Sequence, residues 1–189
     1  MILRETRISG AYLTDIQPIE DQRGFFARTF CEREFAEVGV QVRMVQANIS
    51  WNRRRGTVRG MHFQRPPSQE GKLVRCTRGR IFDVIVDLRP DSPTYTQHVA
   101  VELTAASRQA LYVPPGLAHG FQTLEDDSEV FYQMSDFYDQ SLAAGVRWND
   151  PVFGIDWPIS AVIILDRDGS YRNFDAKAYA SEFTTWTKK

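Results

Sequence analysis

The chain has 189 residues, 42% of them hydrophobic and 12% aromatic, which is enough for one domain with a packed core. Its formal net charge of -1 gives no general attraction to nucleic acid or to an anionic membrane surface. No apolar run approaches the roughly 18 residues that span a bilayer, and the N-terminus lacks a signal-peptide pattern. We therefore expect a soluble, cytoplasmic protein with a single domain over residues 1–189.

Short runs of β-type residues recur along most of the chain, at intervals of roughly 10 to 15 residues and with turn signals between them. The predicted strands cover residues 12–19, 42–49, 57–64, 72–78, 80–88, 96–103, 109–113 and 129–137. This rhythm favours an antiparallel sandwich or barrel over alternating β and α units.

Two stretches favour short helices. Residues 32–38 are followed by Gly39, a typical helix stop, and residues 175–183 predict a second helix near the end of the chain. The sequence contains no repeat, low-complexity tract or linker. We therefore expect a mainly β protein with few helices.

The predicted strand 80–88 carries carboxylates among apolar residues. Between Ile81 and Leu88, one face is wholly apolar, whereas on the other face Asp83 and Asp87 alternate with Ile81 and Ile85. Acidic side chains are rarely buried without partners. This strand therefore indicates a sheet whose inner surface lines a polar cavity.

A denser set of polar groups lies in the neighbouring predicted strands. Arg59 and His62 belong to the run 56–64, and Lys72 begins the next strand. Because burial of unpaired charges is unfavourable, three such groups in otherwise apolar strands suggest a pocket. A guanidinium, an imidazole and an ammonium together indicate proton chemistry on an anionic substrate.

The sequence offers a poor set of metal ligands. Cys31 and Cys76 lack the CxxC spacing of a zinc knuckle and cannot form a disulfide framework. The Pro-x-Gly-x-x-His pattern that ends at His119 resembles the second motif of the cupin superfamily, small double-sheet barrels with the active site at the mouth. Metal-binding cupins have two histidines in their first motif, and here Gln64 replaces the second. We expect no metal and no cofactor.

Further blocks extend this match over roughly residues 3 to 175. They are DQRGFF (21–26), QANIS (46–50), GTVRGMHFQ (56–64), KLV (72–74), DVIVDLR (83–89), SPTY (92–95), PGLAHGF (115–121), WNDP (148–151) and WP (157–158). In this order and spacing, the blocks resemble the dTDP-4-dehydrorhamnose 3,5-epimerase family. The resemblance implies an all-β fold, a cupin-type double-sheet jelly-roll barrel with a few short helices.

The resemblance also implies a reaction, the epimerisation of a nucleotide-diphosphate 4-keto-6-deoxyhexose such as dTDP-4-dehydro-6-deoxyglucose. The ketone acidifies the neighbouring C–H bonds, so a base can remove a proton and an acid can return one to the opposite face through an enolate. His62 matches the base, Tyr132 the acid and Lys72 the cation beside the carbonyl oxygen. Asp168 matches the carboxylate that orients His62, with Asp83 as the alternative.

Other positions match substrate contacts. The residues implied to bind the substrate are Arg23, Gln46, Asn48, Arg59, Lys72, His119, Tyr138 and Arg167. Arginine suits the oxygens of a diphosphate, and Tyr138 would stack on the base. The resemblance further implies a homodimer in which N-terminal strands cross to the partner, so that Arg23 reaches the neighbouring site.

Several alternatives stay open. Arg28 and Ala143 stand where the family usually has glutamate, and Leu165 stands where it usually has serine. The sequence does not distinguish inversion at carbon 3, at carbon 5 or at both, and it does not define the base or the sugar. A single-carbon epimerase of another nucleotide sugar and a non-catalytic cupin that binds a nucleotide sugar are the alternative functions.

Overall fold

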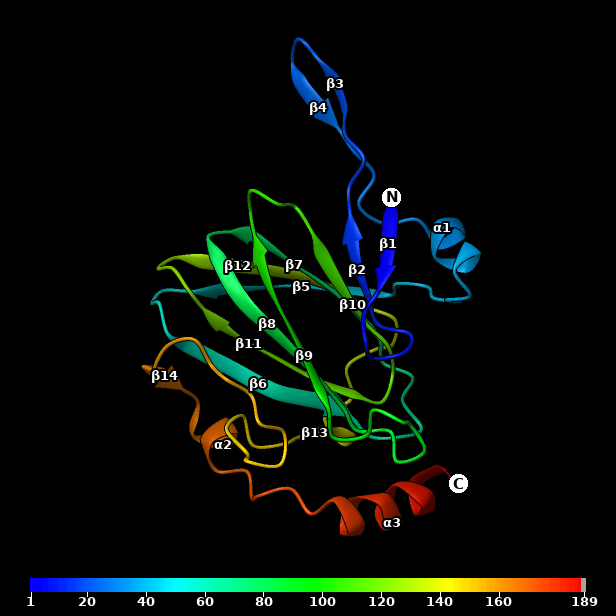
Figure 1. Ribbon diagram of the computed structural model, residues 1–189, viewed down its shortest axis with the longest axis vertical. Coiled ribbons are helices and arrows are strands. Elements are labelled where there is room, and N and C mark those ends of the chain that lie inside the picture. Colours follow the sequence, from blue (N-terminus) through cyan, green and yellow to red (C-terminus); the bar gives the residue numbers. More distant parts are fainter. Residues whose placement is uncertain (188–189) are drawn as a thin grey trace.

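Two facing β-sheets form the body of the protein in the computed structural model, which describes residues 1–187 (Figure 1). One sheet runs in the order β1 (Ile2–Glu5), β2 (Tyr12–Asp15), β10 (Ala110–Val113), β7 (Lys72–Arg78), β12 (Ser128–Met134) and β5 (Gln46–Asn52). The other runs β13 (Ala143–Gly145), β6 (Thr57–Gln64), β11 (Leu117–Thr123), β8 (Arg80–Asp87) and β9 (His98–Thr104), and β14 (Ile163–Ile164) also pairs with β6. This is the cupin-type double-sheet barrel that the sequence predicts.

The strands β6 and β7 begin and end where the sequence places them. Strand β11 was not predicted, because it is buried along its whole length and therefore lacks the alternation of a half-exposed strand. The prediction for residues 42–49 was wrong at its start, since β5 begins only at Gln46, and the prediction for 129–137 extends beyond Met134, where β12 ends.

The predicted strand 12–19 is divided in two. Strand β2 ends at Asp15, and a separate two-stranded hairpin follows, formed by β3 (Ile19–Asp21) and β4 (Gly24–Phe26). This hairpin projects away from both sheets (Figure 1). In the single chain its apolar side chains are exposed to solvent, Ile19 to 70% and Phe26 to 72%.

Helices cover the outer faces of the sheets. The predicted helix α1 (Glu32–Glu37) is present, and its buried Phe35 packs edge-on against Tyr112 of β10. The second predicted helix is α3 (Ala176–Thr187), which contributes Tyr179 to an aromatic cluster outside the second sheet. A single turn, α2 (Asp166–Gly169), was not predicted. Among residues 1–187, no helix is long and apolar enough to cross a membrane.

Strand β8 is buried on both of its faces. Ile81 and Ile85 belong to the core between the two sheets, whereas Val84 and Val86 pack against the cluster outside the second sheet. The predicted division of the two faces is therefore confirmed. Asp83 lies between the two isoleucines and is also fully buried, which explains why its carboxylate needs a specific partner.

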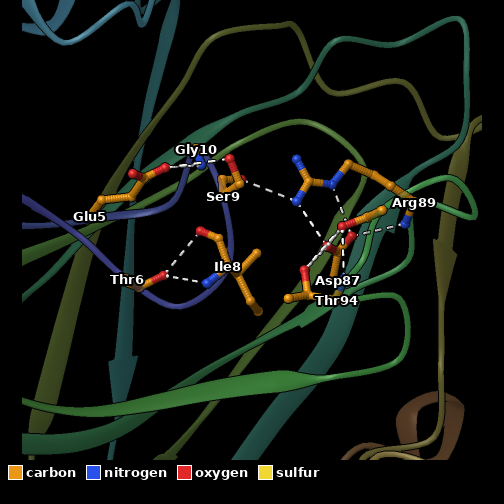
Figure 2. Close-up of polar contacts among 9 residues, drawn as sticks. Glu5, Thr6, Ile8, Ser9, Gly10, Asp87, Arg89 and Thr94 are labelled. Atoms are coloured by element: carbon orange, nitrogen blue, oxygen red, sulfur yellow. Dashed lines mark hydrogen bonds and ion pairs between the residues drawn. The ribbon is translucent and has the colours of Figure 1, made fainter.

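Asp87, at the end of β8, is fully buried and is not among the residues that line the cavity between the sheets, so the predicted polar cavity does not include it. Its carboxylate accepts hydrogen bonds from the backbone and side chain of Arg89 and from the hydroxyl of Thr94 (Figure 2). The hydroxyl of Ser92 donates to it as well. Burial raises the pKa of Asp87, but these hydrogen bonds outweigh it, and the pKa falls below its usual value. Arg89 also donates to the Ser9 carbonyl, so Asp87 anchors two turns to each other.

Candidate active site

A cavity of about 900 Å³ opens between the two sheets. Strands β5, β7 and β12 of one sheet, β6 and β11 of the other, and the segment 163–168 contribute to its lining. The four predicted catalytic residues, His62, Lys72, Tyr132 and Asp168, all line this cavity. The fold thus brings together groups that lie far apart in the sequence.

Two glycines allow β6 and β11 to approach closely at the cavity wall. A Cβ atom on Gly60 would lie 2.6 Å from the Cα atom of Gly120, and Gly60 has a φ of +123°. The register pairs His62 with His119 and Arg59 with Phe121, so β6 contains one residue more than β11 between these pairs. This bulge explains how Arg59 and His62 both reach the cavity, since residues three apart face opposite sides of a regular strand.

His62 is paired with Asp168, a residue 106 positions further along the chain. The His62 Nε2 atom lies 2.8 Å from Asp168 Oδ1, and the backbone N–H of Gly60 donates to Asp168 Oδ2. Arg167 donates from Nε to Asp168 Oδ1, and its Nη2 lies 3.1 Å from His62 Nε2. The shorter contact with a carboxylate favours a proton on Nε2, which leaves Nδ1 as the ring nitrogen that can accept a proton.

The charge of Asp168 is stabilised by these contacts. Burial raises the pKa of Asp168, but the hydrogen bond and the electrostatic attraction from His62, together with Gly60 and Arg167, bring it below its usual value. Asp168 is therefore ionised near neutral pH. An ionised carboxylate fixes the tautomer of His62 and stabilises the imidazolium that forms when the ring takes a proton.

A second histidine–carboxylate pair lies beside the first. His119 Nε2 is 2.8 Å from Asp83 Oδ1, and Asp83 Oδ2 is buried without a hydrogen-bond partner among the described residues. Of the two carboxylates considered for His62, Asp168 contacts it, whereas Asp83 contacts His119. The side chain of His119 lines the cavity but is almost buried.

Lys72 and Tyr132 face the histidines from the opposite sheet. The Lys72 ammonium lies 2.5 Å from Glu70 Oε1. Burial raises the pKa of Tyr132, the charge of Glu70 raises it further, and Arg59 opposes both effects. Glu70, which was not predicted from the sequence, also lines the cavity. The available signal was its position two residues before Lys72, since such residues lie on one side of an extended chain.

The predicted binding residues are divided between the cavity and its surroundings. Those that line the cavity are Gln46, Asn48, Arg59, Lys72, His119, Tyr138 and Arg167. Arg23 lies instead on the projecting hairpin, where it is exposed and paired with Asp21. Arg28 is paired with Glu34 of α1, and Ala143 of β13 lies opposite Gln64 of β6. Trp51 and Ile163, which were not predicted from the sequence, add apolar lining to the cavity.

Each of the two histidines that line the cavity is paired with one carboxylate, His62 with Asp168 and His119 with Asp83. Within residues 1–187, no three His, Cys, Asp or Glu side chains form a group that could hold a metal ion. The fold and the cavity define a class of protein: a cupin-type barrel whose cavity is lined by a histidine–aspartate pair, a lysine and a tyrosine.

Comparison with known proteins defines the family. The model of the family described as dTDP-4-dehydrorhamnose 3,5-epimerase matches residues 5–176. The dTDP-4-dehydrorhamnose 3,5-epimerase of Methanothermobacter thermautotrophicus is 43% identical over 171 residues, which are 89% of this chain and 91% of that protein. The chain belongs to the dTDP-4-dehydrorhamnose 3,5-epimerase family, whose members are isomerases, and the resemblance seen in the sequence is confirmed.

Solved structures agree with this assignment. NovW, a 4-keto-6-deoxy sugar epimerase from the novobiocin biosynthetic gene cluster of Streptomyces spheroides, is 37% identical with a TM-score of 0.89, covering 97% of this chain and 92% of its own. The dTDP-6-deoxy-D-glucose-3,5-epimerase of Legionella pneumophila, solved in complex with dTDP-4-keto-L-rhamnose, is 31% identical with a TM-score of 0.87, covering 96% of each chain.

Proposed function

We propose that this protein inverts carbon 3 and carbon 5 of dTDP-4-dehydro-6-deoxyglucose and so forms dTDP-4-dehydrorhamnose. One observation carries the proposal: His62 on β6 and Tyr132 on β12 line one cavity from opposite sheets. A sugar ring held between them is accessible to a base on one face and to an acid on the other. Inversion of a carbon centre requires this arrangement, because the proton leaves one face and returns to the opposite one.

The proposed reaction proceeds through an enolate. His62, oriented by Asp168, takes the proton from a carbon next to the ketone, and the electron pair moves onto the carbonyl oxygen. The Lys72 ammonium stabilises the negative oxygen. Tyr132 then donates its proton to the carbon from the opposite face. Each inversion leaves His62 with one proton more and Tyr132 with one fewer, so exchange with water restores both groups.

The remaining polar groups of the cavity are proposed to bind the nucleotide-diphosphate part of the substrate. Arg59 and Arg167 supply positive charge for phosphate oxygens, and His119 adds a hydrogen-bonding ring. Gln46 and Asn48 on β5 offer amide groups to the nucleotide, and the half-exposed Tyr138 offers a ring for the base.

We also propose that two copies of the chain form a homodimer through the β3–β4 hairpin. The hairpin carries exposed Phe26, and the edge strand β5 carries Ile49, which is also largely exposed. An edge strand and a projecting hairpin can pair between copies and cover both apolar surfaces. Arg23, near the hairpin turn, would then reach the cavity of the partner, which β5 lines. Light scattering should give twice the mass of the chain.

The reaction is tested by solvent exchange. The protein is incubated with dTDP-4-dehydro-6-deoxyglucose in deuterated water, and the sugar is examined by NMR. We expect deuterium at carbons 3 and 5 and the signals of the doubly inverted sugar. Deuterium at one carbon alone would establish a single-carbon epimerase. Binding without exchange at either carbon would refute the catalytic proposal and support a non-catalytic nucleotide-sugar-binding cupin.

A further inference from the structure

Glu70 is a cavity carboxylate that the proposed reaction does not use. It lies just before β7, and its side chain is only 5% exposed. Among the described residues, the carboxylates that line the cavity are Glu70 and Asp168, and Asp168 is committed to His62. A nearly buried carboxylate on the wall of a binding cavity requires a specific partner.

The partner of Glu70 is the ammonium of Lys72. Their contact of 2.5 Å joins two side chains that are both close to full burial, so water competes little for either charge. An ammonium has three N–H donors, and Glu70 Oε1 can accept one of them. Two donors are left for a substrate oxygen. The ion pair thus restricts where a flexible lysine side chain places its charge.

Glu70 also places a negative charge in the cavity that Tyr132 lines. The charged or titratable groups lining the same cavity are Arg59, His62, Lys72, His119, Tyr138, Arg167, Asp168 and Glu70. Most of them are cationic or can become so, which would favour a tyrosinate. Burial raises the pKa of Tyr132 and Glu70 raises it further, while Arg59 lowers it. Glu70 therefore counteracts the cations of the site.

We propose that Glu70 is a positioning residue, whose carboxylate fixes Lys72 Nζ for the enolate oxygen and sets a negative charge into the cavity wall that Lys72 and Tyr132 share. The inference rests on the proposed epimerase function and adds to it a second acidic residue. Asp168 prepares the base, and Glu70 prepares the groups that stabilise the enolate and return the proton. Each half of the reaction thus has a carboxylate of its own.

Two variants separate position from charge. Glu70→Gln keeps the shape and can still accept a hydrogen bond from Lys72 but removes the charge. We expect its pH profile of deuterium exchange to lose activity on the alkaline side at a pH lower by about one unit, with the acidic side unchanged. Glu70→Asp keeps the charge, but its side chain is one methylene shorter, so the carboxylate lies farther from the Lys72 ammonium. We expect kcat to fall about tenfold with the alkaline limb unchanged.

The matched control is Glu129→Gln, also a loss of one charge, at a residue of β12 that bonds Thr77 outside the cavity. It should leave both readouts unchanged. NMR of ring-labelled tyrosine, with Tyr132→Phe to assign the signal, follows the titration of Tyr132 without activity. In Glu70→Gln this signal should titrate at lower pH.

The outcomes are distinguishable. If the unaltered protein shows no exchange, the proposed function fails. If that protein is active and Glu70→Gln and Glu70→Asp match it in pH profile and kcat, only the role of Glu70 is overturned. Should Glu70→Gln not fold, as judged by circular dichroism, Glu70→Asp alone decides: a lower kcat supports the proposal, and an unchanged kcat overturns it.

Discussion

Two histidine–carboxylate pairs of equal length stand side by side in this protein, and they differ in access to the cavity. In both, Nε2 lies 2.8 Å from a carboxylate oxygen. The His62 side chain is 33% exposed, whereas that of His119 is 10% exposed. The partner of His119 is Asp83 on the neighbouring strand β8, whereas the partner of His62 is Asp168 in α2, which lies far from His62 in the sequence. Since the pairing is the same in both, the comparison teaches that ring exposure is the feature that makes His62, and not the proposed substrate-binding residue His119, the candidate base.

Removal of the imidazole ring of either histidine should give the largest effect on kinetics and tests whether the two pairs differ in role. We expect His62→Ala to lower kcat for deuterium exchange by about 10³-fold, because the proposed base is lost. His119→Ala should mainly raise KM, by about tenfold, because it removes a proposed substrate contact. Steady-state kinetics on both variants measure the two effects. Equal losses of kcat in the two variants would show that exposure does not separate the roles.

Removal of each carboxylate charge gives the next largest effect. Asp168→Asn should lower kcat by about 10²-fold, since an amide does not stabilise the imidazolium of His62. Asp83→Asn should instead lower the free energy of unfolding by about 1–3 kcal/mol, because its hydrogen bond to His119 is buried. Kinetics and urea unfolding are compared for both variants. A catalytic loss confined to Asp83→Asn would reverse the assignment.

The strand contact that holds the two histidines together is tested by Gly60→Ala. The added methyl carbon would lie 2.6 Å from Gly120 Cα, and alanine disfavours a φ of +123°. We expect the free energy of unfolding to fall by about 2 kcal/mol or more. Gly24→Ala is a control for conformation alone, since Gly24 has a φ of +124° and open space around it. Similar losses in both variants would argue against the importance of the close contact.

The smallest expected effect concerns acid stability. The folded pKa of Asp168 is lowered, so its contribution to stability is present above the usual carboxyl pKa and is lost as the pH falls through the lowered value. The stability difference between the unaltered protein and Asp168→Asn should therefore be constant above about pH 5 and shrink below about pH 4. Urea unfolding across this range measures it. A difference that grows on acidification would contradict the lowered pKa.

The sequence predicted the strands and helices whose ends are marked by turn residues close by in the chain. Strands β6 and β7 lie between clear turns, and α1 ends before Gly39, which has a φ of +84°. The turn α2 could not be predicted in this way. It has only four residues, and its Asp168 is held by His62 and by the Gly60 backbone, so contacts distant in sequence stabilise it.

By itself, the sequence determined a sandwich or barrel of antiparallel strands, because strand spacing and side-chain alternation are properties of single segments. Its ordered motifs, through their resemblance to the epimerase family, indicated the cupin-type barrel and the residues that meet in its cavity. The tertiary structure alone decided which carboxylate meets which histidine and that Glu70 is paired with Lys72. From the sequence, either Asp83 or Asp168 could have been the partner of His62. The register of β8 and β11 places Asp83 beside His119 instead. Hydrogen bonds act over a few ångströms, and sequence separation carries no measure of that distance.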